Sequence, residues 1–263
     1  MKTSLIIATY NWKEALALVL KSVLGQSRLP DEIIVADDGS PDGTGELVRN
    51  FAARSVIPVS HCWQEDMGFR AARSRNNGIA RAQGDYIILV DGDIVLEKHF
   101  VEDHIDCAEP EFFIQGSRAL LGRKKTAAML KRGLVDVRIT DRGVGNRKNC
   151  LRSKVASGLF SGSTENYAGL KTCNFSFFRK DAVAINGFNE DFVGWGREDS
   201  EFAARLMHSG TRRRNLRFRA LAYHLYHPEL EREALPKNDA ILANTIKNRL
   251  TRCENGLNLH ATP

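Results

Sequence analysis

Short apolar runs alternate with amphipathic stretches over the first hundred residues of the chain. The expected strands are Leu5–Ala8, Glu32–Ala36, Val59–Trp63 and Tyr86–Val90. The expected helices lie between them, at residues 12–25, 42–54 and 68–83. Apolar strands that alternate with helices predict an α/β fold, in which a mostly parallel central sheet is covered by helices on both faces.

Polar clusters follow three of these strands. They are Thr9-Tyr10-Asn11, Asp37-Asp38 and Asp91-Gly92-Asp93. Ligands of parallel α/β sheets bind at the carboxyl ends of the strands, so the three clusters are expected to line one site. Two carboxylates separated by a glycine suit Mg²⁺ or Mn²⁺, and the glycine lets a large group approach the backbone. A single Asp-x-Asp is more often a polar turn, and the convergence of the clusters is what favours a site.

Beyond residue 115 the pattern is less regular. Residues 116–171 are rich in basic residues and glycine, and they predict a mobile loop region with one short helix near 127–131. Order is expected to return with a strand at 172–178, a short helix at 180–186 and a helix after Asp199. A strand at 218–226 and a peripheral helical tail complete the prediction.

Composition limits the class of protein. The 263 residues are 43% hydrophobic, enough for a large core, and the net charge of +6 suits an anionic partner. The five cysteines contain no CxxC pair, which indicates reduced thiols in a cytoplasm rather than disulfides or a zinc site. Neither a signal peptide nor a membrane span is evident, so we expect a cytoplasmic protein, with peripheral contact at the inner face of the membrane.

The motifs together resemble glycosyltransferase family 2, an inverting group with the GT-A (Rossmann-like) fold. Ile6–Asn11, Val35–Ser40 and Asp91–Asp93 stand in the order and spacing usual for that family. Gly194–Asp199 is similar to the Gly-Trp-Gly-x-Glu-Asp signature of galactosyltransferase-type C-terminal segments. The resemblance implies a GT-A domain over residues 1–228 and leaves 229–263 as a helical tail. The domain would comprise a nucleotide-sugar half (1–115), the basic loop region (116–171) and an acceptor-side segment (172–228).

The resemblance also implies a role for each motif residue. Residues that would contact the nucleotide sugar are Thr9, Tyr10, Asn11, Asp38, Arg70, Asn76, Asp91, Gly92 and Trp195. Asp38 would accept a hydrogen bond from uracil, and Trp195 would form an apolar platform for a sugar ring. Asp93 would bind Mn²⁺ or Mg²⁺, with Asp91 facing the metal or the ribose. A later histidine would complete the metal site, with His227 preferred and His224 as a second ligand.

The same comparison assigns the catalytic groups. An acceptor hydroxyl needs a base, for which we choose Asp199, with Glu198 orienting the acceptor. Both carboxylates lie at an expected helix start, so the alternative is that Asp199 is an N-cap and Glu198 a solvent-exposed charge. One base and one displacement would invert the anomeric carbon.

The sequence therefore predicts metal-dependent transfer of a hexose or N-acetylhexosamine from a UDP-sugar. The acceptor would be a glycan or lipid-linked glycan of the lipopolysaccharide, capsule or O-antigen type. Basic segments 123–152 and 212–219 would contact an anionic membrane. A nucleotidyltransferase or a non-catalytic carbohydrate-binding protein are the alternatives. A nucleic-acid partner is not expected, because acidic strand ends repel phosphate without a metal.

Overall fold

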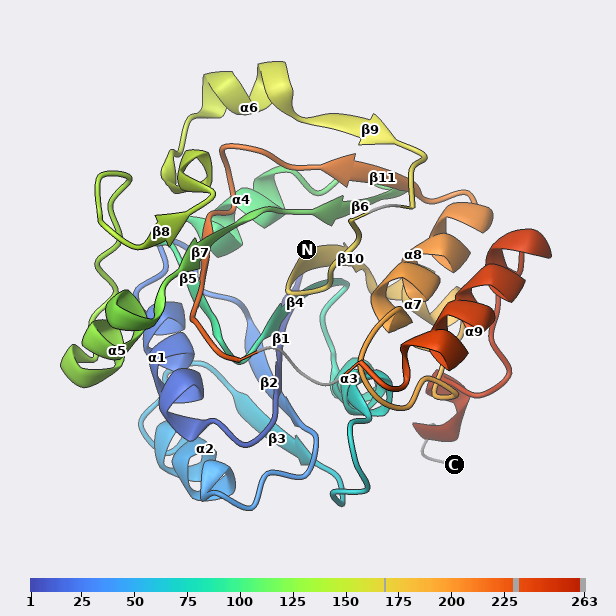
Figure 1. Cartoon of the computed structure of the whole chain (residues 1–263), viewed down its shortest axis with the longest axis horizontal. Helices are drawn as coiled ribbons and strands as arrows, with labels where there is room; N and C mark the ends of the chain where they lie inside the picture. The colour runs from blue at the N-terminus through green and yellow to red at the C-terminus, as the bar shows by residue number, and fades with distance from the viewer. Residues whose placement is uncertain (168, 229–231, 261–263) are drawn as a thin grey trace.

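The computed structural model of the chain describes residues 1–167, 169–228 and 232–260. In it, a large central sheet carries helices on both faces, and a smaller sheet lies beside it (Figure 1). The α/β architecture with a sheet flanked by helices is confirmed.

The first part of the chain alternates strands and helices as expected. Its elements are β1 (Thr3–Thr9), α1 (Lys13–Leu24), β2 (Glu32–Asp37), α2 (Thr44–Ala52), β3 (Val59–Trp63), α3 (Ala71–Arg81), β4 (Tyr86–Asp91), β5 (Ile94–Leu96) and α4 (Phe100–Asp106). The four expected strands are all present, and the helices differ from their expected bounds by one to three residues at each end.

The second part of the chain adds shorter elements. They are β6 (Phe112–Gln115), β7 (Arg118–Leu121), α5 (Arg123–Arg132), β8 (Val144–Gly145), η1 (Arg147–Cys150), α6 (Lys154–Phe160), β9 (Gly162–Thr164), β10 (Asn174–Phe178), α7 (Arg179–Ala184), α8 (Glu198–His208), β11 (Arg212–Asn215), β12 (Ala222–His224), α9 (Leu235–Lys247) and η2 (Leu257–His260). Here η marks a single 3₁₀ turn.

The large sheet is mixed. Its order is β3-β2-β1-β4-β10-β6-β11-β9, in which β1 to β4 form a continuous parallel block and β6 and β11 pair in parallel as well. Strand β10 runs antiparallel to both β4 and β6. Within the parallel block, Thr9 lies opposite Asp37 and Ala8 lies opposite Asp91, so the polar strand ends meet at one edge.

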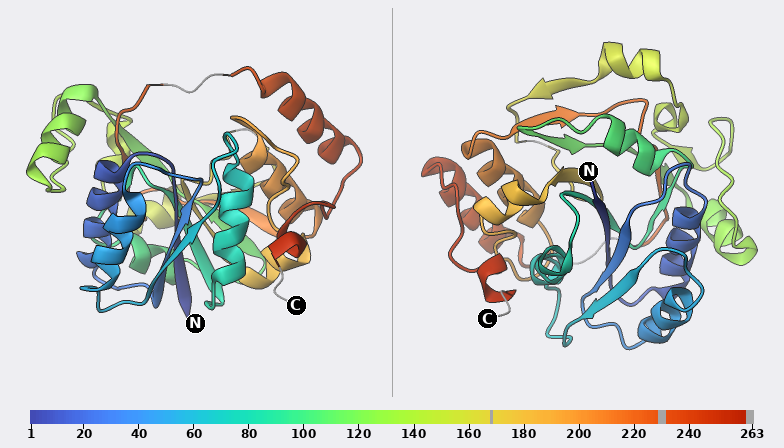
Figure 2. Two further views of the ribbon diagram at one scale, coloured as in Figure 1. Left: turned by 90° about the horizontal axis from the view of Figure 1, so that it is seen from below. Right: turned by 180° about the vertical axis from the view of Figure 1, so that it is seen from behind.

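The core has two layers because side chains alternate across the strands. On one face, Leu5 and Ile7 of β1 pack with α1 and α2. On the other, Ile6 packs with α3 and with a phenylalanine cluster. This cluster includes Phe202 of α8 and Phe188 from the segment before that helix. Figure 2 shows α1 and α2 on one side of the sheet and α3 with the C-terminal helices on the other.

Residues 116–171 are more regular than predicted. Helix α5 spans ten residues there, and β7 and β8 join β5 and β12 in the smaller sheet, of order β5-β12-β7-β8. The helix was largely missed because only Thr126 and Met129 of it are buried, so its apolar stripe is too narrow to give a periodic signal.

Two C-terminal predictions also need correction. The strand expected over 218–226 is limited to β12, because Phe218 and Ala220 have positive φ angles that interrupt extended backbone. The tail forms α9 but is not helical from 248 to 256, and residues 229–231 lie outside the described chain. Helix α9 packs on α8, where the Thr245 hydroxyl donates to buried Glu201, so the tail is integrated into the domain.

Candidate functional site

The carboxyl edge of β1 and β2 presents one exposed aromatic side chain and several polar groups. Tyr10 is 47% exposed, and its hydroxyl donates to Asp66. Asn11 has a positive φ of 47°, and its backbone N–H donates to the Ser40 hydroxyl, which fixes the turn after β1. Thr9 is buried at the strand end. The exposed Tyr10 ring is therefore the part of this motif that is free to stack on a flat ligand.

Asp38 lies at the end of β2 and ties that strand to the start of α3. Its two oxygens accept hydrogen bonds from the Arg70 backbone N–H (2.8 Å) and from the Gln64 side chain (2.6 Å). Burial raises the pKa of Asp38 to about 6, although both hydrogen bonds oppose the shift. The Arg70 Nε is buried without a partner among the described residues, beside a small cavity of about 60 Å³ that Gln64 also lines.

Gly92 has a packing role that differs from the predicted contact with the substrate. A Cβ at this position would lie 2.7 Å from the Thr9 hydroxyl, and the Gly92 N–H donates to the Ala8 carbonyl. The glycine therefore lets the turn after β4 press against β1, and the space next to its Cα is filled by protein.

Asp93 lies beside two histidines from the far end of the chain. Its Oδ2 is 3.3 Å from the Nε2 of His224 and 3.2 Å from that of His227. The antiparallel pairing of β5 and β12, with Ile94 opposite His224, brings these residues together. We call Asp93, His224 and His227 the Asp93 cluster.

The Asp93 cluster combines an ionised carboxylate with two imidazoles that must lose any extra proton before they can bind a metal ion. Burial would raise the pKa of Asp93, but contacts with both histidines outweigh it and hold the pKa well below the ordinary value. The Asp93 contact raises the pKa of His227 to about 9. The second carboxylate oxygen, Oδ1, is buried without a hydrogen-bond partner among the described residues. One carboxylate and two imidazoles within 4.8 Å of one another form a donor set that suits a transition-metal ion such as Mn²⁺.

Asp91 lies beside an arginine, and its contact with the ribose or the metal stays a prediction. Its Oδ1 lies 3.2 Å from the Arg75 guanidinium, and it is not a member of the Asp93 cluster found among the described residues. Arg75 also contacts Glu198 at 2.9 Å and Asp199 at 3.2 Å. Burial disfavours the Arg75 charge, but the three carboxylates more than offset this and raise its pKa further. We call this group the Arg75 cluster.

Arg75 is a residue of the candidate site that the sequence did not point to. It lies on the buried side of α3 with Ala72, Asn76 and Ile79, at helical spacing. A long cation in such a stripe needs buried anions, and this was the available signal. The identity of those anions could not be read locally, because Glu198 is 123 residues away in the chain.

Asp199 is held in place by the segment before β10. The Thr172 hydroxyl donates to one carboxylate oxygen (2.6 Å) and the Thr172 N–H to the other (3.0 Å). The N-cap of α8 is Arg197, with φ of 77°, so the alternative of Asp199 as the cap is wrong. Glu198 is only 8% exposed, so it is not the solvent-exposed charge of the alternative and meets Arg75 rather than open space. Burial and the neighbouring Asp199 charge raise the pKa of Glu198 to about 7.

Asn76 and Trp195 occupy contrasting positions. Asn76 is fully buried, and its amide bonds the backbone N–H and carbonyl of Phe188, both at 2.8 Å, as well as Glu190. It fixes the segment that precedes α8 and does not reach the predicted nucleotide contact, because its donors and acceptor are already paired. Trp195 is 37% exposed with the Arg232 guanidinium 5.3 Å from its ring, so the sugar-platform role stays a prediction.

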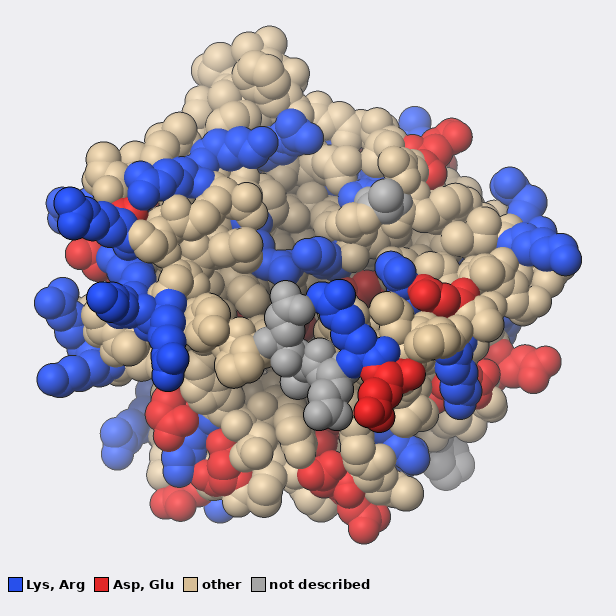
Figure 3. Space-filling view, viewed as in Figure 1, with Lys and Arg blue, Asp and Glu red and all other residues tan. Residues whose placement is uncertain are grey.

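Figure 3 shows a hollow near the middle of one face of the molecule, bordered by Lys and Arg side chains with some acidic side chains close by. The candidate metal ligands lie near the base-like carboxylate, because Arg75 contacts both Asp91 and Asp199 and Asp93 follows Asp91 by two residues. This arrangement suits displacement of a leaving phosphate by a hydroxyl.

Comparisons with protein families place these features in context. The family model described as glycosyl transferase family 2 matches residues 4–156, more than half of the chain. A second model, described as the N-terminal domain of galactosyltransferase, matches residues 159–228, which include the Asp199 segment and both histidines of the Asp93 cluster.

Curated relatives are polysaccharide synthases and other glycosyltransferases. Chondroitin synthase from Escherichia coli is 28% identical over 88% of this chain, and hyaluronan synthase from Pasteurella multocida is 27% identical over 88%. The chain spans only 35% and 25% of the length of these two relatives.

Solved structures show the same fold. TarS 1-349 from S. aureus matches with a TM-score of 0.65 at 18% identity, covering 98% of this chain and 68% of that one. Mannosyltransferase PcManGT from Pyrobaculum calidifontis, solved with GDP-Man and Mn²⁺, matches with a TM-score of 0.60 at 17% identity, covering 94% of this chain and 63% of that one. The expected GT-A architecture is thereby confirmed.

The raised pKa of Glu198 predicts a pH-dependent stability difference. The folded protein holds the proton up to about pH 7, whereas the ordinary value is 4.5. The stabilisation is therefore complete below that ordinary value and is lost as pH rises through about 7. Glu198→Gln removes the titration, so its Tm relative to the wild type should rise between about pH 5 and about pH 8, by roughly 2–4 °C per kcal/mol.

The measurement is thermal unfolding by circular dichroism at both pH values. Glu46→Gln, an exposed glutamate in the first turn of α2, is the matched control and should leave the difference unchanged. A Glu198→Gln Tm that tracks the wild type at both pH values would contradict the assignment.

Proposed function

The chain belongs to glycosyltransferase family 2, and from this membership we propose that it moves a hexose or N-acetylhexosamine from a UDP-sugar to a hydroxyl of a surface glycan. The observation that carries the proposal is the nearness of the Asp93 cluster to Asp199: Arg75 contacts both Asp91 and Asp199, and Asp93 is two residues from Asp91. The polysaccharide synthases among its relatives support a glycan acceptor, such as a lipopolysaccharide, a capsule or an O-antigen.

Asp93, His224 and His227 are the residues that would hold Mn²⁺ or Mg²⁺. The bound ion would neutralise charge on the leaving diphosphate. Two imidazole donors favour Mn²⁺ over Mg²⁺, because Mg²⁺ prefers oxygen ligands alone. The unpartnered Oδ1 of Asp93 is the observation on which this fit rests.

The nucleotide would lie along the ends of β1 and β2. Tyr10 offers a stacking face for the base, and Asp38 offers a carboxylate for the uracil ring. The UDP complex of TarS and the GDP-Man complex of PcManGT show nucleotide ligands on this fold. The preference for uracil rests on the family resemblance of residues 9–11 and of Asp38.

Asp199 would act as the base. The acceptor oxygen bonds to the anomeric carbon as the bond from that carbon to the diphosphate oxygen breaks, and the hydroxyl proton passes to Asp199. A single displacement of this kind inverts the anomeric carbon. Thr172 and Arg75 hold the Asp199 carboxylate in one orientation. A fixed orientation keeps the base close to the acceptor hydroxyl whose proton it takes. Glu198 contacts Arg75 and is a positioning residue in this scheme rather than a contact of the acceptor.

The alternatives are separable by simple assays. A nucleotidyltransferase would release pyrophosphate from a nucleoside triphosphate, whereas a transferase releases UDP from a UDP-sugar. A carbohydrate-binding protein would bind sugar equally with and without a chelator. A panel of UDP-sugars and GDP-mannose with Mn²⁺, read by release of the nucleoside diphosphate, would identify the donor.

Asp93→Ala should abolish the metal dependence of UDP binding. Wild-type affinity for UDP should increase on addition of Mn²⁺, and the variant should lose that increase, with metal affinity at least about 10-fold weaker because a direct ligand is removed. Isothermal titration calorimetry with and without EDTA measures both quantities. Asp136→Ala, an exposed aspartate far from the cluster in sequence, is the control. An unchanged response to Mn²⁺ would show that the metal binds elsewhere.

Asp199→Asn should separate binding from transfer. The amide keeps the shape of the side chain but cannot accept the proton, so transfer should fall about 10²–10⁴-fold while UDP affinity stays near that of the wild type. Steady-state UDP release and calorimetry provide the two readouts. Asp191→Asn, an exposed residue in the loop before α8, is the control. Normal transfer by Asp199→Asn would mean that another group is the base.

The α6 helix supports peripheral contact with an anionic membrane. Val155, Leu159 and Phe160 are 76%, 75% and 59% exposed, and Lys154 lies on the same helix. Figure 3 shows the α6 tip as an uncharged projection with a row of Lys and Arg directly beneath it. The apolar tip could insert among the lipid chains while the cationic row contacts the anionic headgroups. No helix among residues 1–167, 169–228 and 232–260 is long and apolar enough to cross a bilayer.

Replacing both Leu159 and Phe160 by serine should weaken membrane binding. Each side chain contributes about 1.5–3 kcal/mol when buried, so the partition coefficient should fall at least about 10-fold. Co-sedimentation with phosphatidylglycerol-containing vesicles measures the effect, and pure phosphatidylcholine vesicles test the charge requirement. Val183→Ser, at an exposed position on α7, is the control. Equal sedimentation of all variants, or no preference for the anionic lipid, would refute the contact.

A further inference from the structure

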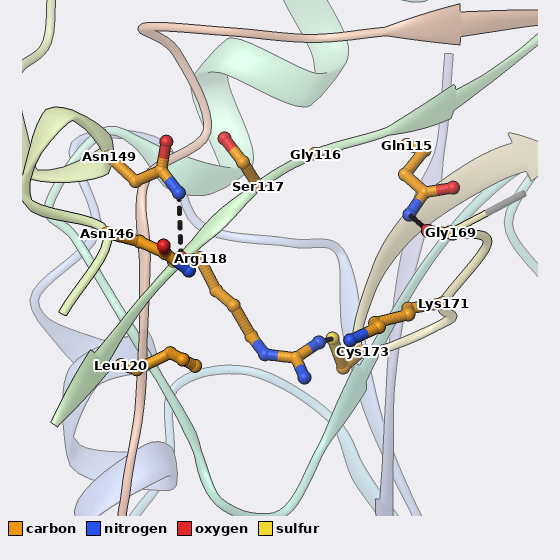
Figure 4. Close-up of a pocket in the computed structure, with 10 residues that line it drawn as sticks. All are labelled: Gln115, Gly116, Ser117, Arg118, Leu120, Asn146, Asn149, Gly169, Lys171 and Cys173. Carbon is orange, nitrogen blue, oxygen red and sulfur yellow. Dashed lines mark hydrogen bonds between the residues drawn. The ribbon is translucent and has the colours of Figure 1, made fainter. Parts of the chain in front are cut away.

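A cavity of about 250 Å³ lies between β7 and the segment that leads into β10. Figure 4 shows Arg118 reaching from β7 across the cavity toward Cys173, with the Lys171 side chain directed to the same region. The volume is below the roughly 300–1,000 Å³ of sites for drug-sized ligands, so it suits one small polar group or one sugar unit. We call it the Lys171 cavity.

The Lys171 cavity is lined by two cations, and the acidic groups that act on it, Asp91, Asp93 and Asp199, lie outside its lining. Its described lining includes Arg118 and Lys171 and contains no Asp or Glu. The Arg118 Nη1 donates to the Cys173 sulfur at 2.6 Å, while its Nε is buried without a partner among the described residues. Burial raises the pKa of the Cys173 thiol to about 12, so the sulfur is neutral near pH 7 and does not balance the guanidinium.

Lys171 and Gln115 add further unused hydrogen-bonding capacity. Lys171 is exposed and makes no hydrogen bond or ion pair within the described chain. Gln115 donates from its amide nitrogen to the Gly169 carbonyl, but its Oε1 is buried with no donor in the part of the chain that the structure describes. The lining therefore combines cationic donors with one acceptor, which complements an anionic group next to a hydroxyl.

The cavity adjoins the reaction centre. Leu120 of its lining pairs across the small sheet with His224, and Lys171 directly precedes Thr172, which binds Asp199. None of its lining residues belongs to β1, β2 or α3, where the nucleotide is expected. The cavity thus lies next to the segment that holds Asp199, and an acceptor hydroxyl would approach from there.

We propose that the Lys171 cavity binds a carboxylate or phosphate group of the acceptor, so that the acceptor is an acidic glycan. This inference rests on the proposed transferase function, because only a transferase has an acceptor. The recognition of the anion rests on Arg118 and Lys171 alone. The two anionic groups share the same chemistry and are separated by the test.

The test compares binding of glucuronic acid, glucose 6-phosphate and glucose. Isothermal titration calorimetry in the presence of UDP and Mn²⁺, with the nucleotide site filled, reports the affinities. Wild-type protein should bind one of the two anionic sugars at least about 5-fold more tightly than glucose. The stronger of the two names the group, and equal binding of all three sugars would overturn the proposal.

Substitutions of the two cations test whether the preference for an anionic sugar arises in the Lys171 cavity. Lys171→Gln should reduce the preference for the anionic sugar roughly 5-fold, and Arg118→Gln about 10-fold, because the guanidinium is the more buried cation. Lys124→Gln, at an exposed position on α5 outside the cavity, is the matched control. Since Lys171 is exposed, its replacement does not threaten folding. A preference that survives both cavity substitutions would overturn the proposal.

The main alternative is that the cavity binds an anionic group of the donor sugar rather than of the acceptor. If Lys171→Gln weakens UDP-glucuronic acid relative to UDP-glucose, the anion belongs to the donor, and the acceptor assignment fails. If the wild type turns over no nucleotide sugar but the anion preference still depends on Lys171, the transferase proposal fails while the anion site stands. The two failures are therefore distinguishable.

Discussion

The Arg75 cluster is the interaction on which the site depends. One buried guanidinium on α3 joins Asp91 at the end of β4 to Glu198 and Asp199 at the start of α8. A buried charge is tolerated only when it is paired, so these elements can adopt their observed arrangement only together. The carboxylate of Asp199, which we propose as the base, is consequently held by a residue of the first hundred, although it lies more than a hundred residues later in the chain.

Antiparallel additions to a parallel block create the rest of the geometry. Strand β10 is inserted next to β4, which carries Thr172 and Cys173 to the edge where the parallel strands end. Strand β12 pairs with β5 in the second sheet and returns two histidines to Asp93. The parallel block alone would offer carboxylates and a nucleotide edge. Both the imidazoles and the orientation of Asp199 come from the later half of the chain.

Patterns of neighbouring residues predicted the strands, the helices and the polar residues at the strand ends. The four parallel strands and the carboxylates at their ends follow from apolar runs and polar stops, and Asp93 with His224 and His227 follows from the family resemblance. Arg75, the buried amide of Asn76 and the Lys171 cavity depend on contacts between segments that are far apart in sequence. Helix α5 was predicted only in part, near 127–131, because just two of its side chains are buried and its apolar stripe is narrow. Asn76 was assigned to a ligand because an amide on a helix near a binding edge has the same local sequence whether it binds a ligand or a loop.

Helix α9 borders the segment that contains Trp195. The Asn238 amide of this helix donates to the Gly196 carbonyl beside the tryptophan, and the helix packs on α8. A substitution that removes the Asn238 amide would consequently release the backbone on one side of the tryptophan while leaving the Asp93 cluster untouched.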